Sequence, residues 1–456
     1  MCVLSIILIA LLISLLVFSM EMTQSTMGPL SAMEGLLGPI LYLWALLFGV
    51  SYLYAWLTSS KSKTTLVKDP KECRSVISAT NFRKSDNKLT PFESRAKYNK
   101  KLRIVFGVEN AFTTTDPEFS QLFTNMSGGL MLLQPAKWKD LAEVIGQNTR
   151  RWLDTPTPSS SYRLFVPLTT MVQSLTLRFI FLSIFSSAHH VLEVPDDALV
   201  KLADAINCTW GAAKKGCDVP VFKDNAYLQE ALSAIFEYNL SDERNNPLSL
   251  ILPGFETLWR VVLRMVLELG FRPEADHDGW TKTLVDFSKS PNRYKIMSPG
   301  LSFLVSAEGL VNETLRLYPP TRRIYRDFQQ GKQSDKTTTY AADVEACHLN
   351  TEIWGPDAAV FNPLRWSNLT KDQEAAFFPF GAVPFQCPAR PSFGPRAIGL
   401  LAGVILRELK NEWTLSEGSD TVKVPEFKGR LSNERSAYNG LFLVRDDDLS
   451  CFPDFK

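Results

Sequence analysis

The chain has 456 residues, of which 45% are hydrophobic, and its formal net charge at pH 7 is +1. This length and apolar content are sufficient for a large buried core, and the near balance of charges argues against a face-wide basic surface for nucleic acid. The seven cysteines are scattered without a C-x-x-C pair, and only four histidines occur. A disulfide framework, a structural zinc site and a multi-histidine metal site are therefore not expected.

Two apolar runs stand at the start of the chain. Residues 3–20 carry no charge and are about long enough to span a bilayer. Residues 36–57 form a second run, with several tyrosines and tryptophans near its C-terminal end, as is typical of a membrane interface. We therefore expect residues 1–60 to be a membrane anchor with two spans. The alternative is a single span at 36–57 that follows a signal peptide or misread leader.

The charges that flank these runs indicate the orientation of the anchor. The link between the runs contains only the acidic residues Glu21 and Glu34, whereas lysines from Lys61 to Lys71 follow the second run. Because positive charge favours the cytosolic side, we expect the catalytic domain, residues 61–456, to face the cytosol at the endoplasmic reticulum membrane.

The first half of the chain contains two clear helical signals. Residues 111–118 have the pattern of a capped helix start. Residues 164–185 are apolar but include Gln173 and Arg178, which favours core helices over a third membrane span. Outside such patterns, His348 is interpreted as an ordinary surface or loop residue.

An acid and an alcohol lie next to each other inside a long apolar helical pattern. Glu256 and Thr257 follow Pro253 and Gly254. A glycine loosens the hydrogen-bond ladder of a helix and can admit water beside the two polar groups. The pair is thus a candidate for proton transfer. The alternative is a surface glutamate next to a threonine that bonds back to its own helix.

A second charged motif lies in residues 307–320, where a predicted helix is stopped by two prolines. Glu313 and Arg316 are three residues apart, share one helical face and can form a charge-assisted pair. Further on, Arg365 could close a Glu–Arg–Arg triad. An E-x-x-R pattern occurs by chance in many helices, so this motif is weak by itself.

Short strands are predicted near the end of the chain. The polar run at residues 329–339 reads as a hairpin turn between two strands, and residues 414–445 contain short β-favourable segments with glycine turns. The fold class that we expect is therefore mainly α with a smaller β region, an α+β arrangement.

One cysteine has a setting that suits metal binding. Cys387 lies between a loop rich in glycine and proline and the apolar helical run 396–407. Loop N–H groups and a helix N-terminus can lower the pKa of a thiol, and the thiolate is the form that binds a metal. The alternative is a buried structural cysteine in a turn.

In their order and spacing these motifs resemble the cytochrome P450 monooxygenases, well over residues 240–445 and loosely before them. The resemblance implies a cytochrome P450 fold around a buried haem b. It also implies roles for several residues: axial iron ligand, surrounding loop, assembly of the haem pocket, and proton delivery to dioxygen. Cys387 would be the axial iron ligand, and Phe380 and Gly381 would belong to the loop around it. Glu313, Arg316 and Arg365 would assemble the haem pocket. Glu256 and Thr257 would deliver protons to dioxygen.

The cysteine loop departs from the pattern of the family at three positions. Val383 and Ala389 stand where glycines are usual, and Phe385 stands where an arginine contacts a haem propionate. A subset of fungal members has the same F-x-C-P-A form. Three arginines after the E-x-x-R helix are candidates to replace the missing contact, and Arg323 is the one we assign. The candidates are Arg322, Arg323 and Arg326.

The resemblance implies a monooxygenase that hydroxylates a small apolar substrate with dioxygen. Electrons are expected from NADPH through a separate cytochrome P450 reductase, because the chain has no dinucleotide-binding fingerprint. The fungal likeness suggests secondary-metabolite biosynthesis of a terpenoid or polyketide. Two alternatives are a haem–thiolate isomerase or dehydratase that does not use dioxygen, and a haem-free binding or scaffold protein. The Glu256–Thr257 pair argues against the first, while Val383 and Phe385 motivate the second.

Overall fold

The computed structural model describes residues 64–80, 88–155, 157–158, 163–185, 193–215, 219–239, 242–273, 277–293, 305–329, 337–410, 412–418 and 423–446. Both apolar runs that we expect to anchor the chain, and hence the proposed boundary at residue 60, lie outside these ranges. Among the described helices, none combines the length and the hydropathy that a membrane span requires.

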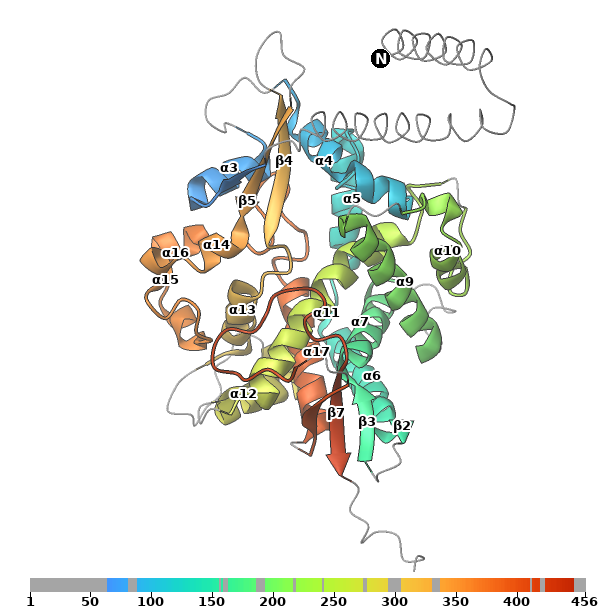
Figure 1. The fold of residues 1–456 in the computed structure, drawn as a ribbon, viewed down its shortest axis with the longest axis vertical. Helices are drawn as coiled ribbons and strands as arrows, with labels where there is room; N and C mark the ends of the chain where they lie inside the picture. The colour runs from blue at the N-terminus through green and yellow to red at the C-terminus, as the bar shows by residue number, and fades with distance from the viewer. Residues whose placement is uncertain are drawn as a thin grey trace, which may run out of the picture. The chain divides into compact units, whose positions relative to one another are not determined.

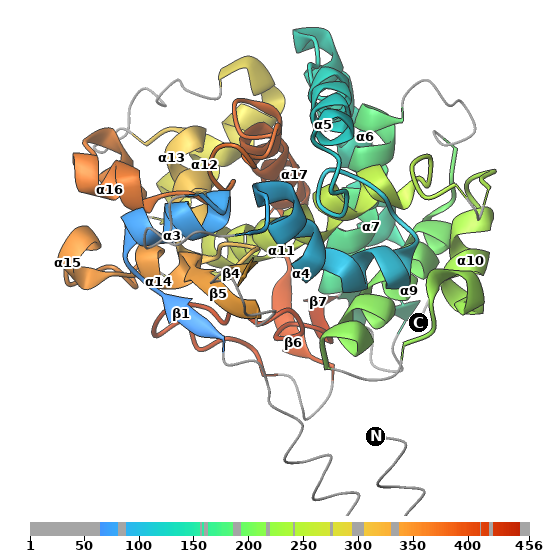
Figure 2. The same ribbon diagram turned by 90° about the horizontal axis from the view of Figure 1, so that it is seen from above.

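Helices make up most of the described chain (Figures 1 and 2). The α-helices are α3 (Pro70–Ser78), α4 (Pro91–Phe106), α5 (Pro117–Leu130), α6 (Pro135–Asp154), α7 (Leu168–Ile184), α9 (Asp196–Lys215), α10 (Ala226–Ser233), α11 (Leu248–Phe271), α12 (His277–Lys289), α13 (Ala307–Leu317), α14 (Val344–His348), α15 (Thr351–Trp354), α16 (Lys371–Ala376) and α17 (Phe393–Leu409). The 3₁₀ helices are η2 (Phe222–Asp224), η3 (Pro291–Arg293) and η4 (Pro363–Ser367).

The expected capped helix start is confirmed at α5. The side chain of Asp116 accepts hydrogen bonds from the N–H groups of Glu118 at 2.9 Å and Phe119 at 3.2 Å. These are backbone donors that the first turn of a helix leaves without an intrahelical partner.

Two small sheets accompany the helices. The first has the order β1-β5-β4, with β1 (Thr65–Val67) parallel to β5 (Thr337–Asp343) and β4 (Arg323–Gln329) antiparallel to it. The expected pair of short strands on either side of the polar run is thus confirmed. The second sheet has the order β2-β3-β7-β6, and comprises β2 (Thr157–Pro158), β3 (Arg163–Pro167), β6 (Thr414–Glu417) and β7 (Leu441–Asp446). The expected mainly α fold with a smaller β region is confirmed.

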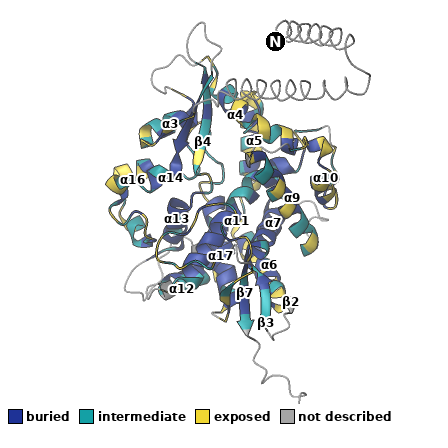
Figure 3. Ribbon diagram, viewed as in Figure 1, coloured by how far each residue is buried: buried dark blue, intermediate teal, exposed yellow. Residues whose placement is uncertain are grey.

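The core is built around α11 and α17, which pack against each other and carry most of the buried surface in the centre of Figure 3. The apolar run that contains Gln173 and Arg178 is a core helix, α7, as predicted, and both polar residues are buried in it. Arg178 donates to the carbonyl of Val194 and to the carboxylate of Asp196, each at 2.6 Å. Its charge is therefore compensated inside the protein.

A segment between β6 and β7 crosses α11, and we call its residues 423–440 the strap (Figure 1). Two arginines, one in α11 and one directly after it, donate hydrogen bonds to the main chain of the strap. Arg260 donates to the carbonyl of Asn433 at 3.0 Å, and Arg272 donates to that of Gly429 at 2.9 Å. The C-terminal part of the chain is thereby fixed over the central helix.

Candidate functional site

The turn before Cys387 is fixed by main-chain hydrogen bonds. The N–H of Cys387 donates to the carbonyl of Phe380 at 2.9 Å, and the N–H of Gly381 donates to that of Phe378 at 3.0 Å. Gly381 has φ +74°, in the left-handed region that favours glycine. The loop therefore presents its cysteine in a defined position before α17 begins at Phe393.

Cys387 is partly exposed, although protein atoms surround its thiol closely. Burial raises the pKa of the Cys387 thiol, and the smaller opposing effects of the Ala389 N–H and the Arg95 guanidinium do not offset it. We expected the loop and helix to lower this pKa, and that prediction is wrong because desolvation of the thiolate is the larger effect. A bound metal cation would supply the positive charge that deprotonates this thiol.

The structure brings Glu313, Arg316 and Arg365 together. Arg316 donates to both carboxylate oxygens of Glu313, from Nε at 2.9 Å and from Nη2 at 2.8 Å. Arg365 Nε donates to Glu313 Oε1 at 3.1 Å. Glu313 and Arg316 are completely buried. Buried charges of this kind are tolerated because their hydrogen bonds and opposite charges compensate for lost hydration.

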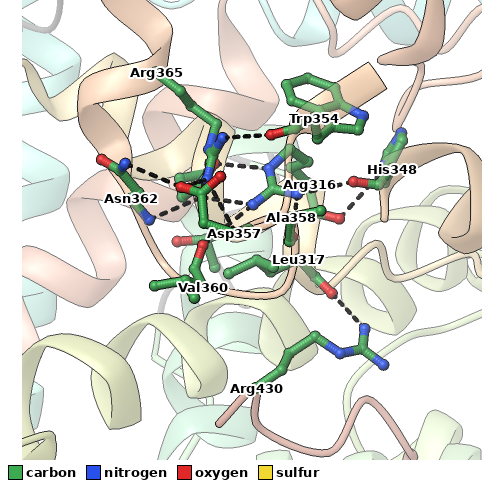
Figure 4. Close-up of polar contacts among 12 residues, drawn as sticks. Arg316, Leu317, His348, Trp354, Asp357, Ala358, Val360, Asn362, Arg365 and Arg430 are labelled. Atoms are coloured by element: carbon green, nitrogen blue, oxygen red, sulfur yellow. Dashed lines mark hydrogen bonds and ion pairs between the residues drawn. The ribbon is translucent and has the colours of Figure 1, made fainter. Parts of the chain in front are cut away.

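Arg316 extends this network to the neighbouring loops. Its Nη1 donates to the carbonyl of Ala358 at 2.6 Å and to that of His348 at 2.8 Å (Figure 4). Figure 4 also shows Arg430 of the strap, which donates to the carbonyl of Leu317 at 2.9 Å at the end of α13. One helix thus connects the triad, the loop after α14 and the strap.

His348 is fully buried, so its interpretation as a surface or loop residue was wrong. The N–H of Phe378 donates to His348 Nε2 at 3.2 Å, which leaves Nδ1–H to donate to the carbonyl of Arg316, also at 3.2 Å. Burial, together with the nearby Arg316, lowers the pKa of His348 to about 3. The neutral ring therefore links the triad helix to the start of the Cys387 loop.

Of the arginines after α13, Arg326 reaches the cysteine loop and Arg323 does not. Arg326 is buried, with its guanidinium carbon 5.2 Å from the ring centre of Phe385. Arg323 has a side chain that is 41% exposed and pairs with Asp343 at 3.2 Å. The assignment of Arg323 is corrected by the geometry of β4, because strand residues an odd number of positions apart point to opposite faces. The remaining candidate, Arg322, bonds to Glu345 at 2.7 Å.

A further arginine at the loop was missed from the sequence. Arg95 of α4 is buried, and its guanidinium carbon lies 4.5 Å from the ring centre of Phe385. The one signal available was its position three residues after Phe92, on the same face of a helix. Phe92 also contacts Phe385, edge to face at 5.3 Å between ring centres.

The candidate acid–alcohol pair occupies α11, which continues through Pro253. Glu256 binds Arg435 of the strap through both carboxylate oxygens, with Oε1 2.6 Å from Nη2. Arg435 also bonds to Asn207 of α9. The hydroxyl of Thr257 donates back to the carbonyl of Pro253 at 2.9 Å, as in the alternative interpretation of this pair. Glu256 is not a surface residue, because its side chain is 17% exposed.

Comparisons with known proteins agree with the resemblance seen in the sequence. Residues 301–433 match the family model "Cytochrome P450", and this range includes the triad and Cys387. A cytochrome P450 of Panax ginseng, CYP749A22, is 33% identical over 144 residues, which are 29% of this chain and 26% of the relative. Cytochrome P450 52A9 of Candida maltosa is 28% identical over 270 residues, half of each chain. The cytokinin hydroxylase of Arabidopsis thaliana is 38% identical over 92 residues, 19% of this chain and 18% of the relative.

Solved structures agree in fold. The haem domain of cytochrome P450DA has a TM-score of 0.52 at 17% identity, covering 84% of this chain and 87% of that one. CYP175A1 of Thermus thermophilus has a TM-score of 0.50 at 17% identity, covering 84% and 89%. Residues 301–433 thus match the cytochrome P450 family in sequence, and the described chain shares the fold of solved cytochrome P450 structures. The chain matches about a quarter of the length of the Panax relative and half of the Candida relative.

The family implies a haem group, and the residues at the cysteine loop fit one. Cys387 is partly accessible in a rigid turn, and two buried arginines, Arg95 and Arg326, lie close to the same loop. Such a donor set suits an iron ligand together with the negatively charged edge of a haem. Cys387 would hold the iron.

Proposed function

We propose that the protein is a haem–thiolate monooxygenase that hydroxylates a small apolar molecule. The observation that carries this proposal is the setting of Cys387: a partly accessible cysteine, in a turn fixed by main-chain bonds, on a loop tied by His348 to the buried Glu313–Arg316 pair. Bound haem supplies the activation of dioxygen, which the electron density of a cysteine ligand favours. The name of the Arabidopsis relative, a hydroxylase, supports the same reaction class.

The protein's own residues would have distinct tasks in this function. Glu313, Arg316 and Arg365 hold the segments around the cysteine loop in place and take no part in the chemistry. The hydroxyl of Thr257 and the carboxylate of Glu256 are the groups that we assign to delivery of the protons that dioxygen reduction consumes. Because Glu256 binds Arg435 through both oxygens, this delivery requires the ion pair to open or a water molecule to connect the two residues.

The remaining parts of the proposal come from the sequence. Electrons would come from NADPH through a separate reductase, since the chain has no nucleotide-binding fingerprint. Residues 1–60 would anchor the domain to the endoplasmic reticulum membrane, with residues 61–456 in the cytosol. The F-x-C-P-A form of the loop, shared with fungal members, supports a step in secondary-metabolite biosynthesis, on a terpenoid or polyketide.

An absorption spectrum tests the proposal. The reduced, carbon monoxide-treated protein is expected to show the red-shifted Soret band of thiolate haem, and Cys387→Ala is expected to lack it. Cys208→Ala is the matched control, because Cys208 is an exposed cysteine on α9. A normal band in Cys387→Ala, or loss of the band in Cys208→Ala alone, contradicts the assignment of the ligand.

The Glu256–Arg435 ion pair favours a second candidate function. An acid held by an arginine and a threonine bonded back to its helix are less suited to proton delivery than two free groups. A haem–thiolate isomerase or dehydratase, which does not use dioxygen, would need no such delivery. Incubation of a panel of apolar substrates under nitrogen separates the two. An isomerised or dehydrated product formed without dioxygen and NADPH supports this candidate, and a strict requirement for both supports the monooxygenase.

A further inference from the structure

Two buried cations converge on one aromatic ring beside the cysteine. The guanidinium carbon of Arg95 on α4 lies 4.5 Å from the ring centre of Phe385, and that of Arg326 on β4 lies 5.2 Å from it. The side chain of Arg95 lies in addition 4.4 Å from the ring centre of Phe112. Both arginines are nearly inaccessible, with 7% and 5% of their surface exposed.

Neighbouring residues fix these two arginines relative to each other. The hydroxyl of Ser94, next to Arg95, donates to the carbonyl of Asp327, next to Arg326, at 2.6 Å. The N-terminus of α4 is closed by a capping box in which Thr90 and Glu93 bond to each other's backbone N–H groups. The first turns of α4 are therefore attached to the edge of β4, and the pair of cations forms part of a rigid framework.

In the described part of the chain, Arg95 forms no ion pair with a carboxylate, and the Cys387 thiol is the group whose charge would oppose its own. The side chain of Arg95 contacts the two aromatic rings, whereas Arg326 at least donates to the carbonyls of Ile77 at 3.1 Å and Tyr325 at 2.7 Å. Burial, and then the proximity of Arg326, lower the pKa of Arg95 to about 9. An unpaired buried cation is unfavourable unless an anion completes the site.

The missing negative charge has the chemistry of a carboxylate ligand. A guanidinium fork matches a carboxylate with two parallel hydrogen bonds, and haem carries two carboxylates on one edge. Phe385 cannot supply such a bond, although the related loops place an arginine at this position. The loop thus lacks a cation at this position, while Arg95 of α4 lies close to the ring that stands there.

We propose that Arg95 of α4 replaces the loop arginine, binding a haem carboxylate together with Arg326 while Phe385 forms an aromatic support beneath the two guanidinium groups. This inference rests on the proposed haem–thiolate function. It assigns the binding of the cofactor's acidic edge to a helix some distance in sequence from the cysteine motif. It also gives a use to an arginine that would otherwise be an uncompensated buried charge.

The test measures how firmly haem is held. Full-length protein produced with a haem precursor is purified as wild type, Arg95→Leu and the control Lys100→Leu, which removes an exposed cation from the same helix. Transfer of haem to excess apomyoglobin is then followed by absorbance. Arg95→Leu is expected to transfer haem about tenfold faster or more, as for loss of a hydrogen bond between charged groups, and Lys100→Leu is expected to match wild type.

A second variant distinguishes binding from a structural role. In Arg95→Leu/Phe385→Arg the cation returns to the loop, and the transfer rate is expected to fall back toward the wild-type value. The haem-free form of Arg95→Leu should also melt no lower than haem-free wild type, because the substitution removes an unpaired buried charge. A merely structural arginine would give neither result.

The outcomes separate this inference from the proposed function. Wild-type protein that forms no thiolate–haem band overturns both. Wild-type protein with that band, together with Arg95→Leu that releases haem at the wild-type rate, overturns the assignment of Arg95 alone. Faster release from Arg95→Leu without recovery in the double variant, combined with a lower melting temperature of its haem-free form, also overturns it.

Discussion

At Glu256 and Thr257, two adjacent side chains of α11 have different partners. The carboxylate is held by Arg435 from the strap, and the hydroxyl is bonded to the helix itself. Thr257 can therefore be changed without leaving a buried charge unpaired, whereas a change at Glu256 would leave Arg435 without its anion. This difference makes Thr257 the better position at which to separate catalysis from folding.

Thr257→Ala is expected to retain haem and substrate binding while product formation falls and consumed NADPH is diverted to hydrogen peroxide. The hydroxyl to which we assign proton delivery is lost, but the cost in unfolding free energy should be about 1 kcal/mol or less, because the lost bond is one neutral hydrogen bond within a helix. Product and peroxide formed per NADPH are the measurements. Thr257→Ser is the control, and full coupling in Thr257→Ala would exclude Thr257 from the relay.

At the scale of elements, α13 connects several parts of the site through one side chain. Its Arg316 bonds to Glu313 and to the carbonyls of His348 and Ala358. A lysine in this position has the same charge but lacks the planar fork, so it cannot satisfy these acceptors together.

Arg316→Lys is accordingly expected to lower the free energy of unfolding by about 2–4 kcal/mol, because buried acceptors lose hydrogen bonds to a charged donor, and to reduce the yield of haem-bound protein. Urea unfolding followed by fluorescence measures the change. Arg322→Lys is the control, since Arg322 pairs with Glu345 at the edge of the same region with a side chain that is 32% exposed. Its expected effect is about 1 kcal/mol or less. Equal effects of the two substitutions would contradict the role of α13.

Local sequence patterns were sufficient to predict some of these features and not others. The spacing of Glu313 and Arg316 predicted their pair, and the polar run after β4 predicted the hairpin, because both depend on neighbours in sequence. The strand residues Arg323 and Arg326 could not be distinguished, since β4 lacks a clear alternation of apolar residues that would show its inner face. Arg95 was missed because it meets the cysteine loop through tertiary packing alone.

At the scale of the whole molecule, the buried neutral ring of His348 makes stability depend on pH. The pKa of this ring is lowered from 6.5 to about 3 in the folded protein, mainly by burial. Below pH 6.5 the unfolded chain therefore binds a proton that the folded protein does not. Stability from this group is complete above pH 6.5 and is lost as the pH falls toward 3.

The expected loss is about 1 kcal/mol per pH unit below pH 6.5. His348→Gln should be less stable at pH 7, where it loses the bond to Arg316, but should lose less stability than wild type between pH 6.5 and 5. Urea unfolding at several pH values measures both slopes, and the comparison of the two proteins removes the contribution of other titrating groups. Identical slopes would show that His348 is not the acid-sensitive group.

That residues 1–60 anchor the chain in a membrane remains a prediction. Protease added to intact microsomes is expected to degrade residues 61–456 and to protect the loop between the two apolar runs, around Met27. Detergent-treated microsomes are the control, in which that loop should be cleaved as well. Protection of the large domain in intact microsomes would mean that the orientation is reversed.

The strap is attached to the protein in two ways. Some of its main-chain carbonyls accept bonds from arginines outside it, such as Arg260 and Arg272. Its own Arg430 and Arg435 donate to groups outside it. A main-chain acceptor is present whatever side chain the residue carries. Positions that contribute only a main-chain carbonyl can therefore change in sequence while the path of the strap over α11 is kept. Since Arg435 of the strap contacts Glu256, the segment offers a surface beside α11 that can change in sequence at such positions without loss of the scaffold.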